Sequence, residues 1–96
     1  MSLYLTAVLT AKPGSAEALK TLLQDLVVQS TKEAACLQYE LYQSAEDENI
    51  FIFHETWENQ EGLDQHDQQP YIQNLIEKSP ELTAVPMTLH KTIRLS

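Results

Sequence analysis

Apolar and polar residues alternate in four segments of the chain, as they do in a β-strand that packs one face against a core. In residues 3–11, leucine and alanine occupy the odd positions, and tyrosine, threonine and valine the even ones. The other alternating segments are residues 36–44, where Leu37, Tyr39 and Leu41 are expected on one face, and residues 50–57 and 86–95. The pattern therefore predicts four strands.

Between the first two strands, apolar residues recur every three or four positions, which indicates an amphipathic helix of about five turns. A turn at Lys12-Pro13-Gly14-Ser15 precedes it, and the Ser15 hydroxyl is suited to cap its first turn. The inward stripe of this helix comprises Ala16, Leu19, Leu22, Leu23, Leu26, Val27 and Ser30.

The region between the third and fourth strands has the pattern of two short helices. Asn59 is a suitable cap for a helix over residues 60–66, and Pro70 is typical of the start of a second one. We expect Ser79-Pro80 to end the second helix and residues 81–85 to form a loop. Its apolar positions are Tyr71, Ile72, Leu75 and Ile76.

The resulting order, β-α-β-β-α-β, predicts an α+β fold of the ferredoxin-like kind, with a four-stranded antiparallel sheet and the helices on one face. Polar residues 45–49 would join the second and third strands as a hairpin. The third strand carries Phe51 and Phe53 on one face but Ile50 and Ile52 on the other. Because an uncovered apolar face needs a partner, we expect a single-domain chain, residues 1–96, that forms a homodimer through its sheet faces.

The charge of the chain excludes two classes of partner. With 14 acidic and 6 basic residues its net charge is −8, which repels nucleic acid and acidic membrane surfaces alike. No apolar run approaches the roughly 20 residues that span a bilayer, and the N-terminal residues have the pattern of a strand rather than a signal peptide. Cys36 is the only cysteine, and its apolar neighbours are typical of a buried thiol rather than a nucleophile. We expect a cytoplasmic protein with no nucleic-acid or membrane partner.

Three segments of the chain match the pattern of one known superfamily. They are the opening strand with the Lys-Pro-Gly turn and the leucine-rich helix that follow it, the strand Cys-Leu-Gln-Tyr-Glu-Leu-Tyr-Gln from Cys36 to Gln43, and the segment from Phe51 to His66. The last holds the most specific element, Glu55-x-Trp57 followed by Leu63-Asp64-x-His66. Together these segments resemble the antibiotic biosynthesis monooxygenase superfamily, whose small members are dimeric α/β barrel proteins and include cofactor-free quinol monooxygenases. The resemblance extends over nearly the whole chain.

The chain departs from this pattern in two places. Ala34-Ala35-Cys36 replaces the Pro-Gly-Cys that often precedes the second strand, and Tyr71-Ile72 stands where His-Phe is frequent. Haem-degrading relatives share the tryptophan, but they use an asparagine in the first strand and a histidine in the last helix. This chain has Ala7 and Leu75 in those regions, so haem cleavage is disfavoured.

The resemblance implies a monooxygenase that oxidises a quinol or related electron-rich aromatic with O2 and without a cofactor. Such a protein must hold a flat substrate in an apolar pocket, stabilise its anion and accept a proton. His66 is the candidate catalytic residue, as proton carrier, because imidazole titrates near neutral pH. The candidate substrate-binding residues are Trp57, Glu55, Tyr71, Tyr39 and His54.

Each candidate also has a structural interpretation. Phe51, Phe53 and Trp57 are suited to a core, and Glu55 and His66 to internal hydrogen bonds. His54 shares a face with two isoleucines and suits an interface. The same pocket would also serve an isomerase or C–C cleaving enzyme that acts through an enolate, or a non-catalytic dimeric module that binds a small ligand.

Metal and phosphate sites are not predicted. His54-Glu55 begins like a zinc-protease motif, but Glu58 occupies the position of the second histidine and the segment has the pattern of a strand. Gly14 and Gly62 stand alone, so there is no glycine-rich phosphate loop.

Overall fold

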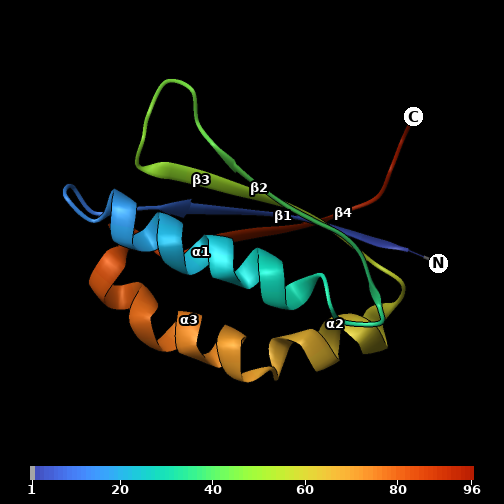
Figure 1. Ribbon diagram of the computed structural model, residues 1–96. Coiled ribbons are helices and arrows are strands. Elements are labelled where there is room, and N and C mark those ends of the chain that lie inside the picture. Colours follow the sequence, from blue (N-terminus) through green and yellow to red (C-terminus); the bar gives the residue numbers. More distant parts are fainter. Residues whose placement is uncertain (1) are drawn as a thin grey trace.

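The computed structural model describes residues 2–96, which form a sheet layer and a helix layer (Figure 1). The chain order is β-α-β-β-α-α-β, with the second helical region divided at Gln68-Gln69 as the sequence predicts. The elements are β1 (Leu3–Thr10), α1 (Ala16–Ser30), β2 (Cys36–Gln43), β3 (Ile50–Trp57), α2 (Gln60–Asp67), α3 (Pro70–Leu82) and β4 (Thr88–Thr92).

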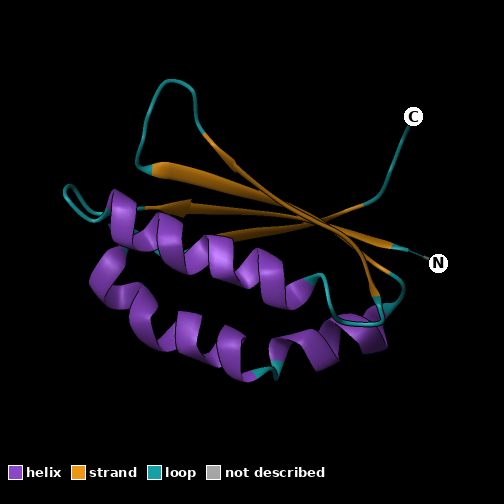
Figure 2. Ribbon diagram, in the orientation of Figure 1, coloured by secondary structure: helices purple, strands orange, loops and turns teal. Residues whose placement is uncertain are grey.

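The sheet has the strand order β2-β3-β1-β4, and every neighbouring pair is antiparallel. All three helices lie on one face of it, and the other face is uncovered (Figure 2). The predicted α+β, ferredoxin-like arrangement is therefore confirmed.

The alternation of each central strand decides which side chains enter the core. The odd positions of β1 and β3 point toward the helices, and Leu9, Phe51 and Trp57 are at most 1% exposed. They pack against Leu19, Leu23 and Leu26 of α1 and Ile72 and Leu75 of α3. Phe51 and Phe53 are thus core residues, as their structural interpretation proposed.

Two predicted details of the strands are wrong. Leu37, expected on the same face as Tyr39, is 57% exposed, because the pairing of β2 with β3 shifts by one residue between Cys36 and Gln38. A bulge of this kind places an extra residue in one strand and reverses the side chain beside it. The last strand is also shorter than residues 86–95, since β4 covers only Thr88–Thr92.

The helix ends differ from the predictions as well. Ser15 precedes α1 but its hydroxyl makes no capping hydrogen bond, and the 15 residues of α1 make about four turns rather than five. α3 continues past Pro80 to Leu82. The C-cap residue Thr83 donates its N–H to the Ser79 carbonyl, and Lys12 N–H, from outside the helix, donates to the Leu82 carbonyl, both at 2.8 Å.

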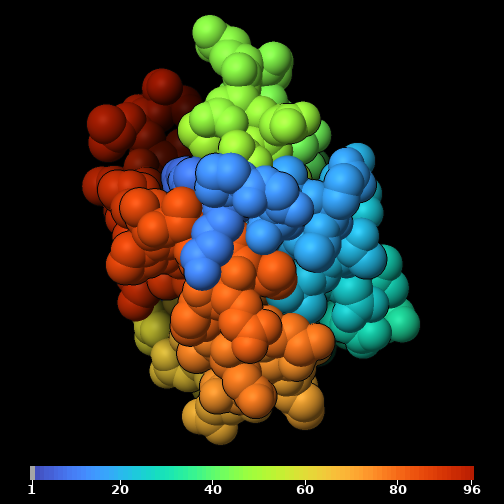
Figure 3. All heavy atoms as spheres, turned by 90° about the vertical axis from the view of Figure 1, so that its left-hand side faces the viewer, coloured from blue at the N-terminus to red at the C-terminus, as the bar shows by residue number. Residues whose placement is uncertain are grey.

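The hairpin between β2 and β3 projects beyond the sheet (Figures 1 and 3). On the uncovered face, register places Val8, Ile52 and Tyr42 in one row and Thr6, His54 and Glu40 in the next. None of the helices within residues 2–96 has the length and apolar character needed to cross a membrane.

Candidate functional site

Strand register brings polar and apolar groups together on the helix-facing side of the sheet. Tyr39, Glu55, Leu5 and Lys91 are successive partners across β2, β3, β1 and β4. Next to this row, Phe53, Ala7 and Leu89 are partners across three strands. The helix layer covers these rows, and a cavity of about 110 Å³ lies between the two layers.

Most of the cavity wall is apolar. Its polar members are Glu55, His66, Asp67 and Lys91. Asp67, Lys91 and the apolar Leu89 are exposed, whereas Glu55 and His66 are buried. The cavity therefore opens toward β4. Its apolar members are Leu5, Ala7, Tyr39, Phe53, Leu63, Ile72, Leu75, Met87 and Leu89.

α2 carries His66 into this wall. The helix starts at Asn59, whose side chain accepts a hydrogen bond from Gly62 N–H at 2.8 Å, the expected cap. The segment before β2 lies against α2, since Glu58 N–H donates to the Ala35 carbonyl at 2.9 Å. A Cβ on Gly62 would lie 2.3 Å from that of Ala35, so only glycine permits this approach. As a result, residues 33–35 and His66 are neighbours.

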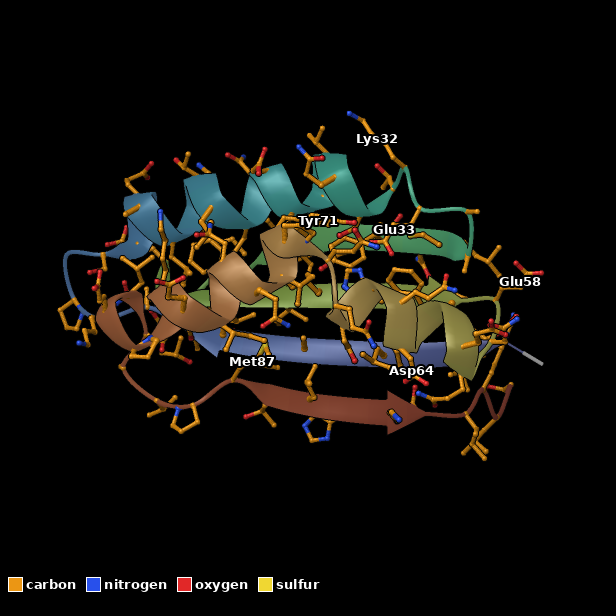
Figure 4. All side chains as sticks on the ribbon, turned by 90° about the horizontal axis from the view of Figure 1, so that it is seen from below. Lys32, Glu33, Glu58, Asp64, Tyr71 and Met87 are labelled. Carbon is orange, nitrogen blue, oxygen red and sulfur yellow. The ribbon has the colours of Figure 1, made fainter. Side chains whose placement is uncertain are left out.

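Glu33 is the residue that organises His66. The Nδ1–H of His66 donates to Glu33 Oε2 at 2.7 Å, and the Tyr71 hydroxyl donates to the same oxygen. Figure 4 shows Glu33 and Tyr71 side by side, whereas Lys32 and Glu58 point outward. The His66 side chain is 4% exposed and that of Glu33 13%. This geometry fixes the imidazole ring and commits one of its two nitrogens to a carboxylate.

A second carboxylate, that of Glu55, also lies near the imidazole. Trp57 Nε1–H donates to Glu55 Oε1 at 2.9 Å, and the indole ring lies 4.3 Å from that of His66, centroid to centroid. Burial raises the pKa of Glu55, although the hydrogen bond from Trp57 and the nearby His66 act in the opposite direction. Glu55 therefore holds a proton more readily than an exposed glutamate.

The surrounding hydroxyl and thiol groups stay protonated at neutral pH. Burial, followed by the charge of Glu55, raises the pKa of Tyr39, and burial with the hydrogen bond to Glu33 raises that of Tyr71. Burial also raises the pKa of Cys36 to about 11, with Glu33 adding to the effect. The titratable groups suited to proton transfer at the cavity are thus His66 and the carboxylates.

The predicted site residues occupy three positions. His66, Glu55 and Tyr39 line the cavity. Trp57 and Tyr71 do not line the cavity; the ring of each packs against the imidazole of His66. His54 lies on the uncovered face of the sheet, 5.3 Å from the ring of Tyr42, so the structure does not bring it to His66.

Sequence reasoning missed Glu33, Asp67 and Lys91. Glu33 lies in a short connection between α1 and β2, 33 positions before its partner His66. No local spacing links the two. The one available signal was that an antiparallel β2–β3 pair returns the end of β3 to the start of β2, which places α2 beside residues 33–35.

Comparison with known proteins shows the family of the chain. The model of the antibiotic biosynthesis monooxygenase family matches residues 2–78, which hold β1 to β3, α2 and most of α3. The chain belongs to that family. The matched range includes Glu33, Glu55, Trp57, His66 and Tyr71.

Proteins similar to this chain differ in how much of it they match. The uncharacterized Synechocystis protein sll1783 is 39% identical over 75 residues, which are 78% of this chain but 51% of that relative, so this chain spans about half its length. YcnE of Bacillus subtilis, whose name proposes a monooxygenase, is 28% identical over 94% of this chain and 95% of its own. The crystal structure of PA3566 from Pseudomonas aeruginosa superposes with a TM-score of 0.93, at 34% identity and with coverage of 99% of this chain and 95% of PA3566.

Proposed function

We propose that the protein is a cofactor-independent monooxygenase that oxidises a quinol or a related electron-rich aromatic with O2. The observation that carries this proposal is the position of His66, buried in the wall of an apolar cavity with its Nδ1–H on Glu33. Membership of the antibiotic biosynthesis monooxygenase family supports the reaction class. The apolar walls suit a flat ring, and the polar groups suit its hydroxyls.

In the proposed reaction, His66 removes a proton from a substrate hydroxyl. The carboxylate of Glu33 stabilises the imidazolium that forms, and the anionic ring passes electrons to O2. A carbon–oxygen bond then forms and the oxygen–oxygen bond breaks. One oxygen atom remains on the ring, and the other leaves as water with two protons from the substrate. A hydroquinone and O2 thus give a hydroxyquinone and water, and the substrate supplies all the electrons.

The roles of the other residues follow from their positions. Glu55, whose pKa is raised, is suited to hold a hydroxyl of the substrate, and Tyr39 is suited to flank the ring. Trp57 fixes Glu55 and Tyr71 fixes Glu33 through hydrogen bonds, and both rings pack against the imidazole. In this proposal His54 belongs to the interface and not to the substrate site.

The proposal includes assembly and location. The uncovered sheet face would pair with its copy in a homodimer, because its apolar row of Val8, Ile52 and Tyr42 would otherwise be exposed to solvent. The single free thiol of Cys36 is compatible with a cytoplasmic location.

The decisive experiment is oxygen consumption by metal-free protein with a panel of hydroquinones, followed by identification of the product. We expect the wild type to consume O2, and His66→Ala to lower kcat/KM by roughly 100-fold or more. Trp57→Phe removes the donor to Glu55 but keeps a buried ring, so we expect a smaller loss.

Lys32→Ala serves as the matched control, since Lys32 is exposed next to Glu33 and points away from the cavity (Figure 4). If no substrate is turned over, or if His66→Ala matches the wild type, the proposal is wrong. Proton exchange at a substrate carbon, or carbon–carbon cleavage without O2 uptake, would instead indicate the enolate chemistry.

A further inference from the structure

The cavity at His66 has a larger apolar neighbour. A groove of about 510 Å³ runs along the C-terminal half of α3 and the connection to β4. Ile76, Pro80, Val85 and Pro86 contribute to its lining. None of these four residues lines the cavity at His66.

Leu75 and Met87 are the two residues that line both spaces. Leu75 is 5% exposed and comes from α3, while the half-buried Met87 comes from the segment before β4. Figure 4 shows Met87 between α3 and β4. These two side chains therefore form the partition between the cavity and the groove.

The volume on the inner side of the partition corresponds to one small ring. An apolar cavity of roughly 150 Å³ in another protein holds a single benzene molecule, and drug-sized ligands occupy about 300 Å³ or more. At about 110 Å³ with an open mouth, the cavity at His66 is close in size to a site for one six-membered ring and well below one for a drug-sized ligand.

We propose that Leu75 and Met87 are specificity-determining residues, which restrict the site to single-ring aromatics by separating it from the groove. Shortening Met87 joins the two spaces and admits a fused two-ring ligand. That the ring is a hydroquinone rests on the proposed function, whereas the size limit concerns binding alone.

The test is anaerobic calorimetric titration with benzene hydroquinone and with naphthalene hydroquinone. We expect the wild type to bind the single ring about tenfold or more tightly than the fused pair. Met87→Ala should reduce that preference about tenfold, mainly by improving the binding of the two-ring ligand. Ile76→Ala is the matched control, since Ile76 is 55% exposed and lines only the groove, and it should keep the wild-type preference.

A variant that fills the cavity tests the same limit from the opposite side. Ala7 is 2% exposed on the cavity floor, so Ala7→Val should weaken the single-ring ligand about tenfold. The proposal is overturned if the wild type binds both ligands within about twofold, if Ile76→Ala changes the preference as much as Met87→Ala, or if neither ligand binds. Binding with the expected preference but without O2 uptake would remove the monooxygenase proposal and leave the size limit standing. Equal turnover of both ligands would remove the size limit and leave the monooxygenase proposal standing.

Discussion

Glu33 has the most unusual surroundings of any single residue in the site. One of its carboxylate oxygens accepts hydrogen bonds from both His66 Nδ1–H and the Tyr71 hydroxyl. Hydrogen bonds to an ionised acceptor are stronger than neutral ones, and a shared acceptor fixes both donors relative to each other. We therefore regard Glu33 as the positioning residue of the proposed reaction.

Replacing Glu33 by glutamine should distinguish the effect of the carboxylate charge on kcat from the effect of the side-chain shape. The amide keeps the size of the side chain but cannot stabilise an imidazolium, so we expect kcat to fall about 10- to 100-fold with KM within about twofold. Tyr71→Phe is the comparison, because it removes the other donor and leaves the contact between His66 and Glu33 intact. Steady-state O2 uptake measures both variants. Equal losses in the two variants, or a change confined to KM, would count against the positioning role.

The buried carboxyl of Glu55 should make stability depend on pH. Its pKa is raised in the folded protein, so its contribution to the free energy of unfolding is complete below the pKa of the unfolded chain and is lost as pH rises through the folded value. Glu55→Gln keeps an acceptor for Trp57 and does not ionise.

We accordingly expect the melting temperature of Glu55→Gln, relative to the wild type, to rise as the pH increases above the ordinary titration range of a glutamate, about pH 4. The pKa of Asp67 is raised in the same direction, but Asp67 is present in both proteins and cancels from the difference. A difference in melting temperature that stays constant over this range would show that Glu55 ionises as freely in the folded chain as in the unfolded one.

At the scale of helices and strands, periodicity alone predicted most of the fold. The faces of β1 and β3 follow from strict alternation, and the division between α2 and α3 follows from Asn59 and Pro70. Two features depend on contacts that are distant in sequence. Leu37 is displaced by a bulge that only the pairing with β3 creates, and the end of α3 beyond Pro80 is held by Lys12 N–H, which donates to the Leu82 carbonyl. Glu33 escaped prediction for the same reason.

The close approach of α2 to the connection before β2 gives a test at this scale. Gly62→Ala should lower the free energy of unfolding by about 1 to 3 kcal/mol, because the new methyl group would overlap that of Ala35. This loss opposes the gain of about 1 kcal/mol that alanine brings to a helix interior. Urea denaturation measures the difference.

Gln65→Ala is the control within the same helix, since Gln65 is exposed and should change stability by no more than about 0.5 kcal/mol. The double variant Ala35→Gly with Gly62→Ala removes the overlap and should recover part of the loss. If Gly62→Ala proves as stable as Gln65→Ala, the contact is looser than the structure indicates.

For the whole molecule, the division into a covered and an uncovered sheet face is the dominant property (Figure 1). The uncovered face holds an apolar row with a polar network beside it, in which Thr56 donates to Gln38 at 2.7 Å and Gln38 to Glu40 at 2.8 Å. Such a mixed composition is compatible with a protein–protein interface, as the proposed homodimer requires.

We expect sedimentation at low micromolar concentration to give a species of twice the 10.9 kDa chain mass. Ile52→Glu places a charge at the centre of the uncovered face and should give the monomer, while Lys32→Glu on the helix layer should not. A wild-type protein that sediments as a monomer would exclude the proposed dimer.

The shared acceptor at Glu33 also bears on how the chain folds. Its bonds join the connection before β2 to His66 and Tyr71, which lie 33 and 38 positions later, whereas Trp57 and Glu55 are two positions apart on one strand. Contacts between distant positions must meet the loop-closure entropy before they form. A chain that is still folding can thus pair its tryptophan with Glu55 well before its imidazole has a carboxylate. Competence for proton transfer should be among the last properties that the molecule acquires, and among the first that it loses when α2 and α3 open.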